Sequence, residues 1–195
     1  MLTDVGILIK PPKAFLGYPS VRLLGQHVDS LGFATAEEKL EAIAQIEFPK
    51  TLKDLETYLG LTSWLRQYVP FYAAVSAPLQ DRKTLLLKIA PTAGAPRKNF
   101  AAATRLYDPT STKIVSFETL QSLYSTPTYL VHFSPARQLY MDLDSSKAFG
   151  LGVVLYHVKG DDEAPPALST EYPKRSDIKP IMFLSRRLSD AETQY

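Results

Sequence analysis

The sequence predicts an α+β fold, in which a helical unit is followed by a small antiparallel sheet. Between residues 51 and 70, apolar side chains recur every three or four positions, which is typical of an amphipathic helix. Between residues 139 and 144, apolar and polar residues alternate, which is the period of a strand with one apolar face. A second run, rich in branched and aromatic residues, follows from 151 to 156 after a short polar turn, so we expect a hairpin.

The composition is that of a folded protein. The chain has 195 residues, of which 45% are apolar and 22% charged, enough for one ordinary domain or two small ones. The net charge of +2 excludes no class of binding partner. Residues 60–107, however, hold a single acid, Asp81, among many basic side chains. These are Arg66, Arg82, Lys83, Lys88, Arg97, Lys98 and Arg105. This middle segment is the part that would favour a phosphate-bearing partner.

Several classes of protein are not expected. The absence of cysteine excludes disulfides and thiolate zinc sites and suits a reducing compartment. The first residues carry no basic leader, and no stretch of 18 apolar residues occurs. We therefore expect an intracellular protein that is not associated with a membrane.

Residues 1–34 are predicted to form a strand, a proline-rich turn and a hairpin. In the hairpin, Leu23 and Leu24 lead into Gly25, after which Val28 continues the second strand.

Two helix starts follow. Thr35 and Glu38 have the spacing of a capping box, and the helix that they would begin ends before Pro49. Thr51 and Asp54 have the same spacing at the start of the second helix.

A third, short helix is expected through Tyr72, Val75 and Leu79, broken at Pro78. Residues 90–115, which combine proline, glycine, serine and threonine with basic side chains, are interpreted as a linker.

After the linker, an amphipathic helix is predicted from residue 116 to 124, with Phe117, Leu120 and Leu123 on its buried side. A strand is expected from 129 to 133.

Asp142 and Asp144 end the first strand of the predicted hairpin. Carboxylates two residues apart on a strand share a face, so a bulge or twist would be needed to give them different roles. Gly150 and Gly152 would leave room beside them for a substrate. The alternative is a plain hairpin whose acids are solvated turn residues, and spacing alone does not decide between the two.

The residues around this hairpin resemble the start of the ribonuclease H domain of gypsy-class LTR retrotransposon polyproteins. That family has Asp-x-Asp-Ala-Ser at the end of its first strand and then a Gly-x-Gly strand. Here residues 142–146 read Asp-Leu-Asp-Ser-Ser, and 150–152 read Gly-Leu-Gly. A later phrase of the family is matched by Ser185, Arg186, Leu188, Ser189, Ala191, Glu192 and Tyr195. The resemblance implies an incomplete mixed sheet of the ribonuclease H type.

Residues 51–70 resemble the thumb of the reverse transcriptases of the same family. The matching residues are Leu55, Tyr58, Leu59, Gly60, Leu61, Tyr68, Val69 and Pro70. Leu24, Gly25 and Val28 match the phrase that closes the palm, which implies that the hairpin is the primer grip. The resemblance divides the chain into a palm-end hairpin at 1–34, a thumb-like helical unit at 35–89, the linker at 90–115, and the amino-terminal part of a ribonuclease H-like domain at 116–195.

The resemblance implies a parent enzyme that copies RNA into DNA and cleaves the RNA strand of RNA–DNA hybrids with Mg²⁺. Asp144 is the implied catalytic residue and metal ligand. The other carboxylates of that site and the paired aspartates of the polymerase are not found in this sequence, so we expect the chain to catalyse neither reaction alone. Glu192 matches a position that starts a helix in the family.

Nucleic-acid contact is the function that remains. By resemblance, the residues that would hold an RNA–DNA hybrid or template–primer duplex are Leu24, Gly25, Lys53, Trp64, Arg66 and Gln67. Two alternatives stay open. One is a solvated helix with a half-buried tryptophan, and the other is a non-catalytic module that associates with an intact retrotransposon polyprotein.

Overall fold

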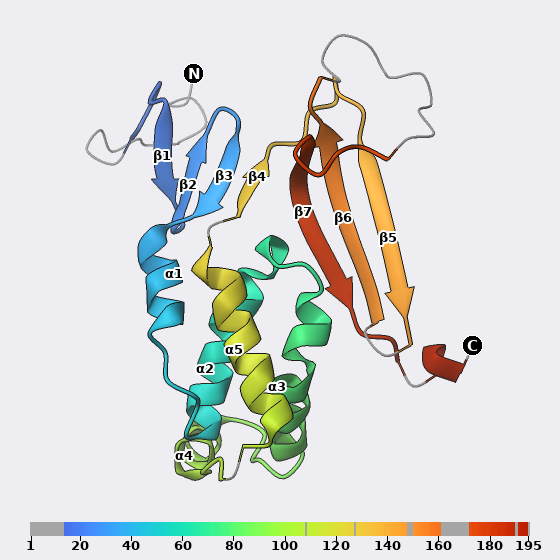
Figure 1. The fold of residues 1–195 in the computed structure, drawn as a ribbon. Helices are drawn as coiled ribbons and strands as arrows, with labels where there is room; N and C mark the ends of the chain where they lie inside the picture. Colours follow the sequence, from blue (N-terminus) through green and yellow to red (C-terminus); the bar gives the residue numbers. More distant parts are fainter. Residues whose placement is uncertain are drawn as a thin grey trace, which may run out of the picture.

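One antiparallel sheet lies at one end of a bundle of helices, and a second antiparallel sheet runs alongside the bundle (Figure 1). The computed structural model describes residues 14–107, 109–126, 128–147, 150–160, 172–189 and 191–194. The predicted α+β fold is confirmed. The strand and proline-rich turn expected before the hairpin lie within residues 1–13, outside the described residues.

The first sheet contains four short strands in the order β1-β2-β3-β4. They are β1 (Ser20–Leu23), β2 (Gln26–Asp29), β3 (Gly32–Thr35) and β4 (Tyr129–Val131), and each pairs antiparallel with its neighbour. The predicted hairpin is β1–β2. Leu24 and Gly25 connect its strands with φ angles of +50° and +76°, as in a type I′ turn, whose twist matches that of the paired strands.

Helix α1 (Glu37–Ala44) begins without the predicted cap. Thr35 is the last residue of β3, and Ala36 takes the cap position with no side-chain hydrogen bond. The backbone N–H of Ala36 donates to the carbonyl of Gly25 at 3.2 Å. The capping box predicted at Thr35 is therefore wrong, because the first sheet continues up to the helix.

Helix α2 (Leu52–Trp64) begins as predicted. The N–H of Asp54 donates to Thr51 Oγ1 at 3.2 Å, and the N–H of Thr51 donates to the Asp54 carboxylate at 3.0 Å, which completes a capping box. A short 3-10 turn, η3 (Arg66–Tyr68), follows the helix.

Helix α3 (Tyr72–Leu87) runs through Pro78, so the predicted break is wrong. A proline in a helix interior removes a hydrogen bond and crowds a carbonyl, at a cost of about 3 kcal/mol. Tyr72 and Leu79, which are 5% and 1% exposed, are buried in the helical core on either side of it. Burial of each such side chain contributes about 1.5–3 kcal/mol, which offsets the cost.

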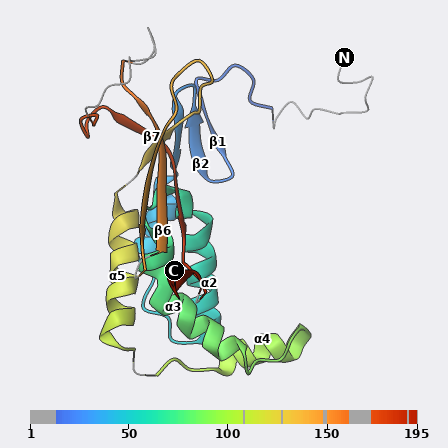
Figure 2. The same cartoon turned by 90° about the vertical axis from the view of Figure 1, so that its right-hand side faces the viewer.

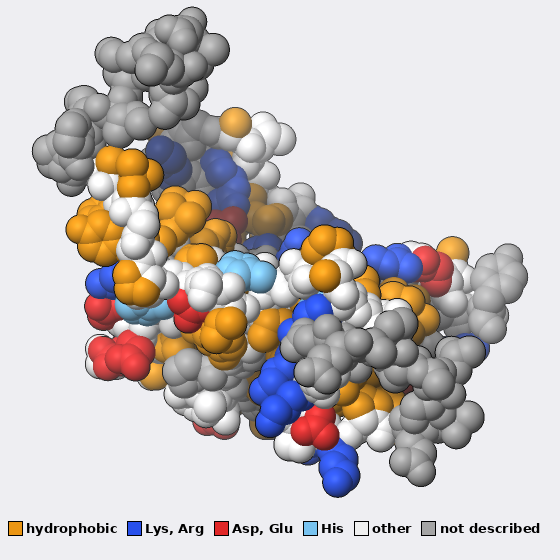
Figure 3. Space-filling view, turned by 90° about the horizontal axis from the view of Figure 1, so that it is seen from above, with side chains coloured by type: hydrophobic (Ala, Val, Ile, Leu, Met, Phe, Trp, Pro, Cys, Tyr) orange, Lys and Arg blue, Asp and Glu red, His pale blue; other side chains and the backbone are white. Residues whose placement is uncertain are grey.

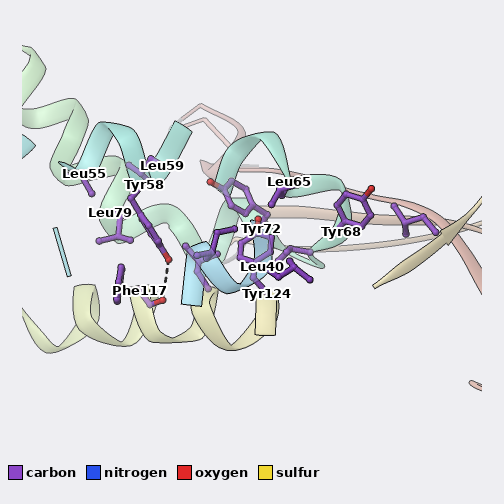
Figure 4. Close-up of a cluster of buried hydrophobic side chains, with 14 residues drawn as sticks. Leu40, Leu55, Tyr58, Leu59, Leu65, Tyr68, Tyr72, Leu79, Phe117 and Tyr124 are labelled. Atoms are coloured by element: carbon purple, nitrogen blue, oxygen red, sulfur yellow. Dashed lines mark hydrogen bonds between the residues drawn. The ribbon is translucent and has the colours of Figure 1, made fainter. Parts of the chain in front are cut away.

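Helix α5 (Ser111–Ser125) packs against α1 and α3 and completes the helical core. Figure 4 shows its Phe117 and Tyr124 pointing towards the tyrosines of α2 and α3. The rings of Phe117 and Tyr58 lie 4.7 Å apart between centroids. Leu123, predicted to be buried, is 36% exposed, and Tyr124 takes its place in the core.

Part of the segment interpreted as a linker is a packed helix, α4 (Gly94–Ala103). Arg97 forms an ion pair with Glu56 of α2, which holds the two helices together. Pro96 does not prevent the helix because it lies in the first turn, where proline is tolerated, and the alanines that follow favour the helix. The interpretation of residues 90–115 as a linker is therefore wrong for residues 94–103 and for residues 111–115, where α5 begins.

The second sheet contains three strands in the order β5-β6-β7, all antiparallel. They are β5 (Tyr140–Ser146), β6 (Gly150–Val158) and β7 (Ile178–Arg186), so the predicted hairpin at 139–156 is confirmed. The strand expected at 129–133 is β4, which pairs with β3 of the first sheet. Helix α5 and β4 therefore pack with elements that precede them in the chain.

The second sheet docks on the helical unit through β7. The N–H of Ala73 in α3 donates to Ser185 Oγ at 2.9 Å, and Arg187 forms an ion pair with Asp81 of the same helix. Phe183 packs against the helical core. Figure 2 shows the sheet edge-on, standing over α3.

The end of the molecule that carries the first sheet exposes many hydrophobic side chains, interspersed with basic and acidic ones (Figure 3). None of the helices in the described part of the chain has the length and apolar character to cross a membrane.

Candidate nucleic-acid interface and the carboxylate pair

One face of α2 is exposed along its length. Lys53, Thr57, Gly60 and Trp64 follow one another at intervals of three or four residues, and all four are exposed. This spacing places them in one row, with about 16 Å between its ends at a rise of 1.5 Å per residue. We name this row the α2 stripe.

Gly60 lies in the middle of the α2 stripe. A Cβ placed on Gly60 would have no atom within 4 Å, so nothing in the described structure requires a glycine there. Glycine in a helix interior is nevertheless roughly 0.5–1 kcal/mol less favourable than alanine. Gly60 was not predicted to be a site residue, although its position between Lys53 and Trp64 on one helix face was a usable signal.

Trp64, which is 45% exposed, lies next to the turn of the first hairpin. The Nζ atom of Lys39 lies 3.9 Å from the centroid of the Trp64 ring and donates to the carbonyl of Leu24 at 3.1 Å. The structure therefore brings Leu24, Gly25 and Trp64 together. Lys39 was not predicted, because nothing in its local sequence signals a contact with residues so far away.

Arg66 and Gln67 lie in η3, beyond the end of α2. They line a groove beside β7 that Leu184 and Arg186 also line. These two predicted residues therefore lie beside the second sheet. Lys53 lies at the other end of the α2 stripe.

Asp142 and Asp144 share a face of the second sheet. The pairing of β5 with β6 is regular along the whole of β5, so the bulge considered for this strand is not there. A register shift occurs between β6 and β7 instead, at Leu155 and Tyr156.

The surroundings of the two carboxylates differ. The hydroxyl of Tyr156 donates to Asp142 Oδ1 at 3.1 Å, and the hydroxyl of Tyr172 donates to the other oxygen of Asp142. Burial and the hydrogen bond to Asp142 raise the pKa of Tyr156 to about 12, so this phenol remains a donor at neutral pH. Asp144 is exposed.

The room expected beside Gly152 is filled by Phe71. This residue precedes α3 with a left-handed φ of +53°, and a Cβ on Gly152 would lie 2.3 Å from its ring. The prediction of open space at this glycine is therefore wrong, because the ring comes from a distant part of the sequence. Phe71, Asp142, Asp144 and Gly152 line a groove of about 490 Å³.

The carboxylate pair does not fit a site for two divalent ions. Magnesium takes several oxygen ligands, and both oxygens of Asp142 already accept hydrogen bonds from phenols. Among the described residues, no three histidine, aspartate or glutamate side chains come together as metal ligands would. Within the part of the chain that the structure describes, Asp144 is left without the further carboxylates that such a site would require.

Glu192 begins the last turn, η4 (Glu192–Gln194), as the family phrase predicts. Its carboxylate accepts from the N–H and the hydroxyl of Ser189 at 2.8 and 2.9 Å, and Arg186 binds it at 2.7 and 3.0 Å. The hydrogen bonds, with that of Arg186 first, lower the pKa of Glu192 to about 2. Tyr195, which ends the phrase, lies outside the described residues.

The chain is similar to retrotransposon polyproteins. No protein-family model matches it. Curated relatives include the Transposon Tf2-3 and Tf2-4 polyproteins of Schizosaccharomyces pombe, each 22% identical over 196 residues. The match covers 100% of this chain, which spans 12% of the length of those relatives.

Solved structures of similar fold include those of a foamy viral protease-reverse transcriptase. In its complex with an RNA/DNA hybrid, the TM-score is 0.61 at 21% identity, over 94% of this chain and 20% of that chain. In a complex with double-stranded DNA, the TM-score is 0.64 at 21% identity, over 99% of this chain and 28% of the other. At this identity, the likeness shows the fold.

The contact between Phe71 and Gly152 can be tested by its effect on stability. Gly152→Ala should lower the free energy of unfolding by about 1–3 kcal/mol in urea denaturation, because the new methyl group and the ring need the same space. In a Phe71→Gly background, which removes the ring and suits the left-handed φ, the same substitution should cost less than about 0.5 kcal/mol. Equal costs in the two backgrounds would show that the ring does not lie over Gly152.

Proposed function

We propose that this chain is part of a gypsy-class retrotransposon reverse transcriptase and ribonuclease H region, and that it binds an RNA–DNA hybrid or template–primer duplex. In this proposal β1–β2 is the primer grip, residues 35–89 form the thumb, and residues 116–195, which include the second sheet, belong to a ribonuclease H-like domain. The observation that carries it is the α2 stripe, which ends at Trp64 beside the turn at Leu24 and Gly25. The similar retrotransposon polyproteins and the nucleic-acid complexes of the viral enzyme of similar fold support it.

The side chains of the α2 stripe suit a nucleic-acid backbone. Lys53 provides a positive charge for a phosphate, and Trp64 provides an exposed ring for stacking on a base or sugar. Gly60 leaves the helix backbone bare between them, which allows a partner backbone to approach closely. Contact with a duplex gives a reason for a glycine that the fold itself does not need.

Gly60→Ala should therefore separate stability from binding. The fold should gain roughly 0.5–1 kcal/mol, because alanine is the better helix former. Affinity for a labelled RNA–DNA hybrid, measured by mobility shift, should fall roughly five- to tenfold, which corresponds to about 1–1.4 kcal/mol of lost close contact.

Ser122→Ala is the matched control, because Ser122 is exposed on α5, away from the α2 stripe. It should leave the affinity for the hybrid unchanged. A wild-type chain with no measurable affinity at low salt would contradict the proposal and favour a helix that is simply solvated.

We further propose that the chain alone neither extends nor cleaves the duplex. A second metal ion would need carboxylates that the described residues do not place near Asp144. Incubated with a labelled hybrid and Mg²⁺, the purified chain should leave the RNA strand intact, as should the Asp144→Asn variant. Magnesium-dependent cleavage that disappears in Asp144→Asn would contradict this part of the proposal.

A second candidate function is association with an intact retrotransposon polyprotein. It is favoured by the face of the second sheet opposite the carboxylates, where Met141, Leu143 and Leu184 are 62%, 60% and 47% exposed. The chain should then co-purify with the full polyprotein, and Leu143→Lys should weaken that association. If the wild-type chain and Leu143→Lys were recovered with the polyprotein in equal amounts, this candidate function would be contradicted.

A further inference from the structure

Lys39 connects residues of the candidate interface that lie far apart in the sequence. Its Nζ atom is 3.1 Å from the carbonyl of Leu24 and 3.9 Å from the centroid of the Trp64 ring. Its side chain also covers Gly25, where a Cβ would lie 2.3 Å from Nζ. One half-buried side chain therefore touches three of the six residues predicted to bind nucleic acid.

The ammonium group of Lys39 is directed towards the hairpin turn and the Trp64 ring. One of its donors is used by the Leu24 carbonyl, and the charge faces the electron-rich ring of Trp64, a cation–π contact. Gly25 fits this arrangement, because its φ of +76° favours glycine and any side chain there would collide with Lys39. The contact thus fixes the turn and the tryptophan relative to one another.

Two further contacts near Lys39 hold the β1–β2 hairpin against the start of α1. The N–H of Ala36 donates to the carbonyl of Gly25 at 3.2 Å, and Arg22 of β1 forms an ion pair with Glu38 at 2.6 Å. Neither reaches α2. Lys39 is the residue of this group that extends the connection to Trp64.

We propose that Lys39 is a positioning residue for duplex binding, which fixes the turn at Leu24 and Gly25 against Trp64 so that the hairpin and the α2 stripe meet a duplex as one pre-formed surface. The inference rests on the proposed function and deepens it. A pre-formed surface binds more tightly because fewer side chains and loops have to be ordered on association.

A direct contact between Lys39 and a phosphate would predict something different. Each phosphate contact contributes about −0.9 to the slope of log affinity against log salt concentration for a duplex. Loss of a positioning residue lowers affinity and leaves this slope unchanged, whereas loss of a phosphate contact lowers both.

The test uses Trp64 as its own probe, because it is the single tryptophan of the chain. Lys39→Ala should make the fluorescence of the free protein more easily quenched by acrylamide. It should weaken hybrid binding about three- to tenfold, with an unchanged salt slope. Lys39→Arg, which keeps the charge and the donors, should retain most of both properties.

Lys53→Ala is the matched control, because it removes one lysine from the far end of the α2 stripe. It should reduce the size of the salt slope by about 0.9 and leave the quenching of Trp64 unchanged. Circular dichroism of each variant checks that the helices remain folded.

The inference is overturned if Lys39→Ala leaves the quenching unchanged, or if it reduces the salt slope as Lys53→Ala does. A wild-type chain that does not bind the hybrid overturns the proposed function instead, and the quenching result, measured without nucleic acid, keeps the two failures apart.

Discussion

The structure depends on the return of α5 to the helical bundle. Tyr58, Tyr72 and Tyr124 are buried in the core, and an unpaired buried hydroxyl costs about 1–3 kcal/mol. The hydroxyl of Tyr124 in α5 donates to the carbonyl of Thr62 at 2.7 Å, and the hydroxyl of Tyr58 donates to the carbonyl of Phe117 in α5 at 3.4 Å. Burial raises the pKa of both phenols, which keeps them neutral donors. Helix α5 thus provides apolar cover for α2 and a hydrogen-bond acceptor for the buried hydroxyl of Tyr58.

This packing also determines what the rest of the molecule exposes. Because one side of α2 is buried in the core, the side that carries the α2 stripe faces outward. Because α5 ends close to the first sheet, the next residues form β4 against β3, with Leu130 fully buried. The chain then enters the second sheet, whose last strand contacts η3 and α3. A non-local contact in the core therefore sets the places of both sheets and of the candidate interface.

The features that the sequence predicted correctly depend on neighbours in the chain. The capping box of Thr51 and Asp54 needs residues three positions apart, and the turn at Leu24 and Gly25 needs residues whose φ angles are positive. The predictions that failed depend on distant partners. Pro78 is tolerated because the core holds the helix on both sides of it, and the amphipathic pattern of α5 shows that one side is buried without showing against what.

The same distinction applies to the candidate interface. The types and spacing of Lys53 and Trp64 were visible in the sequence, and the structure places both on one helix face. The contact of Lys39 with Leu24 and Trp64, and that of Phe71 with Gly152, join segments whose proximity only the fold creates.

The second sheet presents two unlike faces, and each limits what can reach it. Strand β5, which carries Asp142 and Asp144, pairs with β6 alone in the described sheet, so its other edge is open there. The apolar side chains of the opposite face are exposed, and an element that packs onto that face would cover them. On the carboxylate face, the ring of Phe71 lines the grooves on both sides of Asp144. The surroundings of Asp144 therefore depend on how the helical unit holds Phe71, the residue that precedes α3.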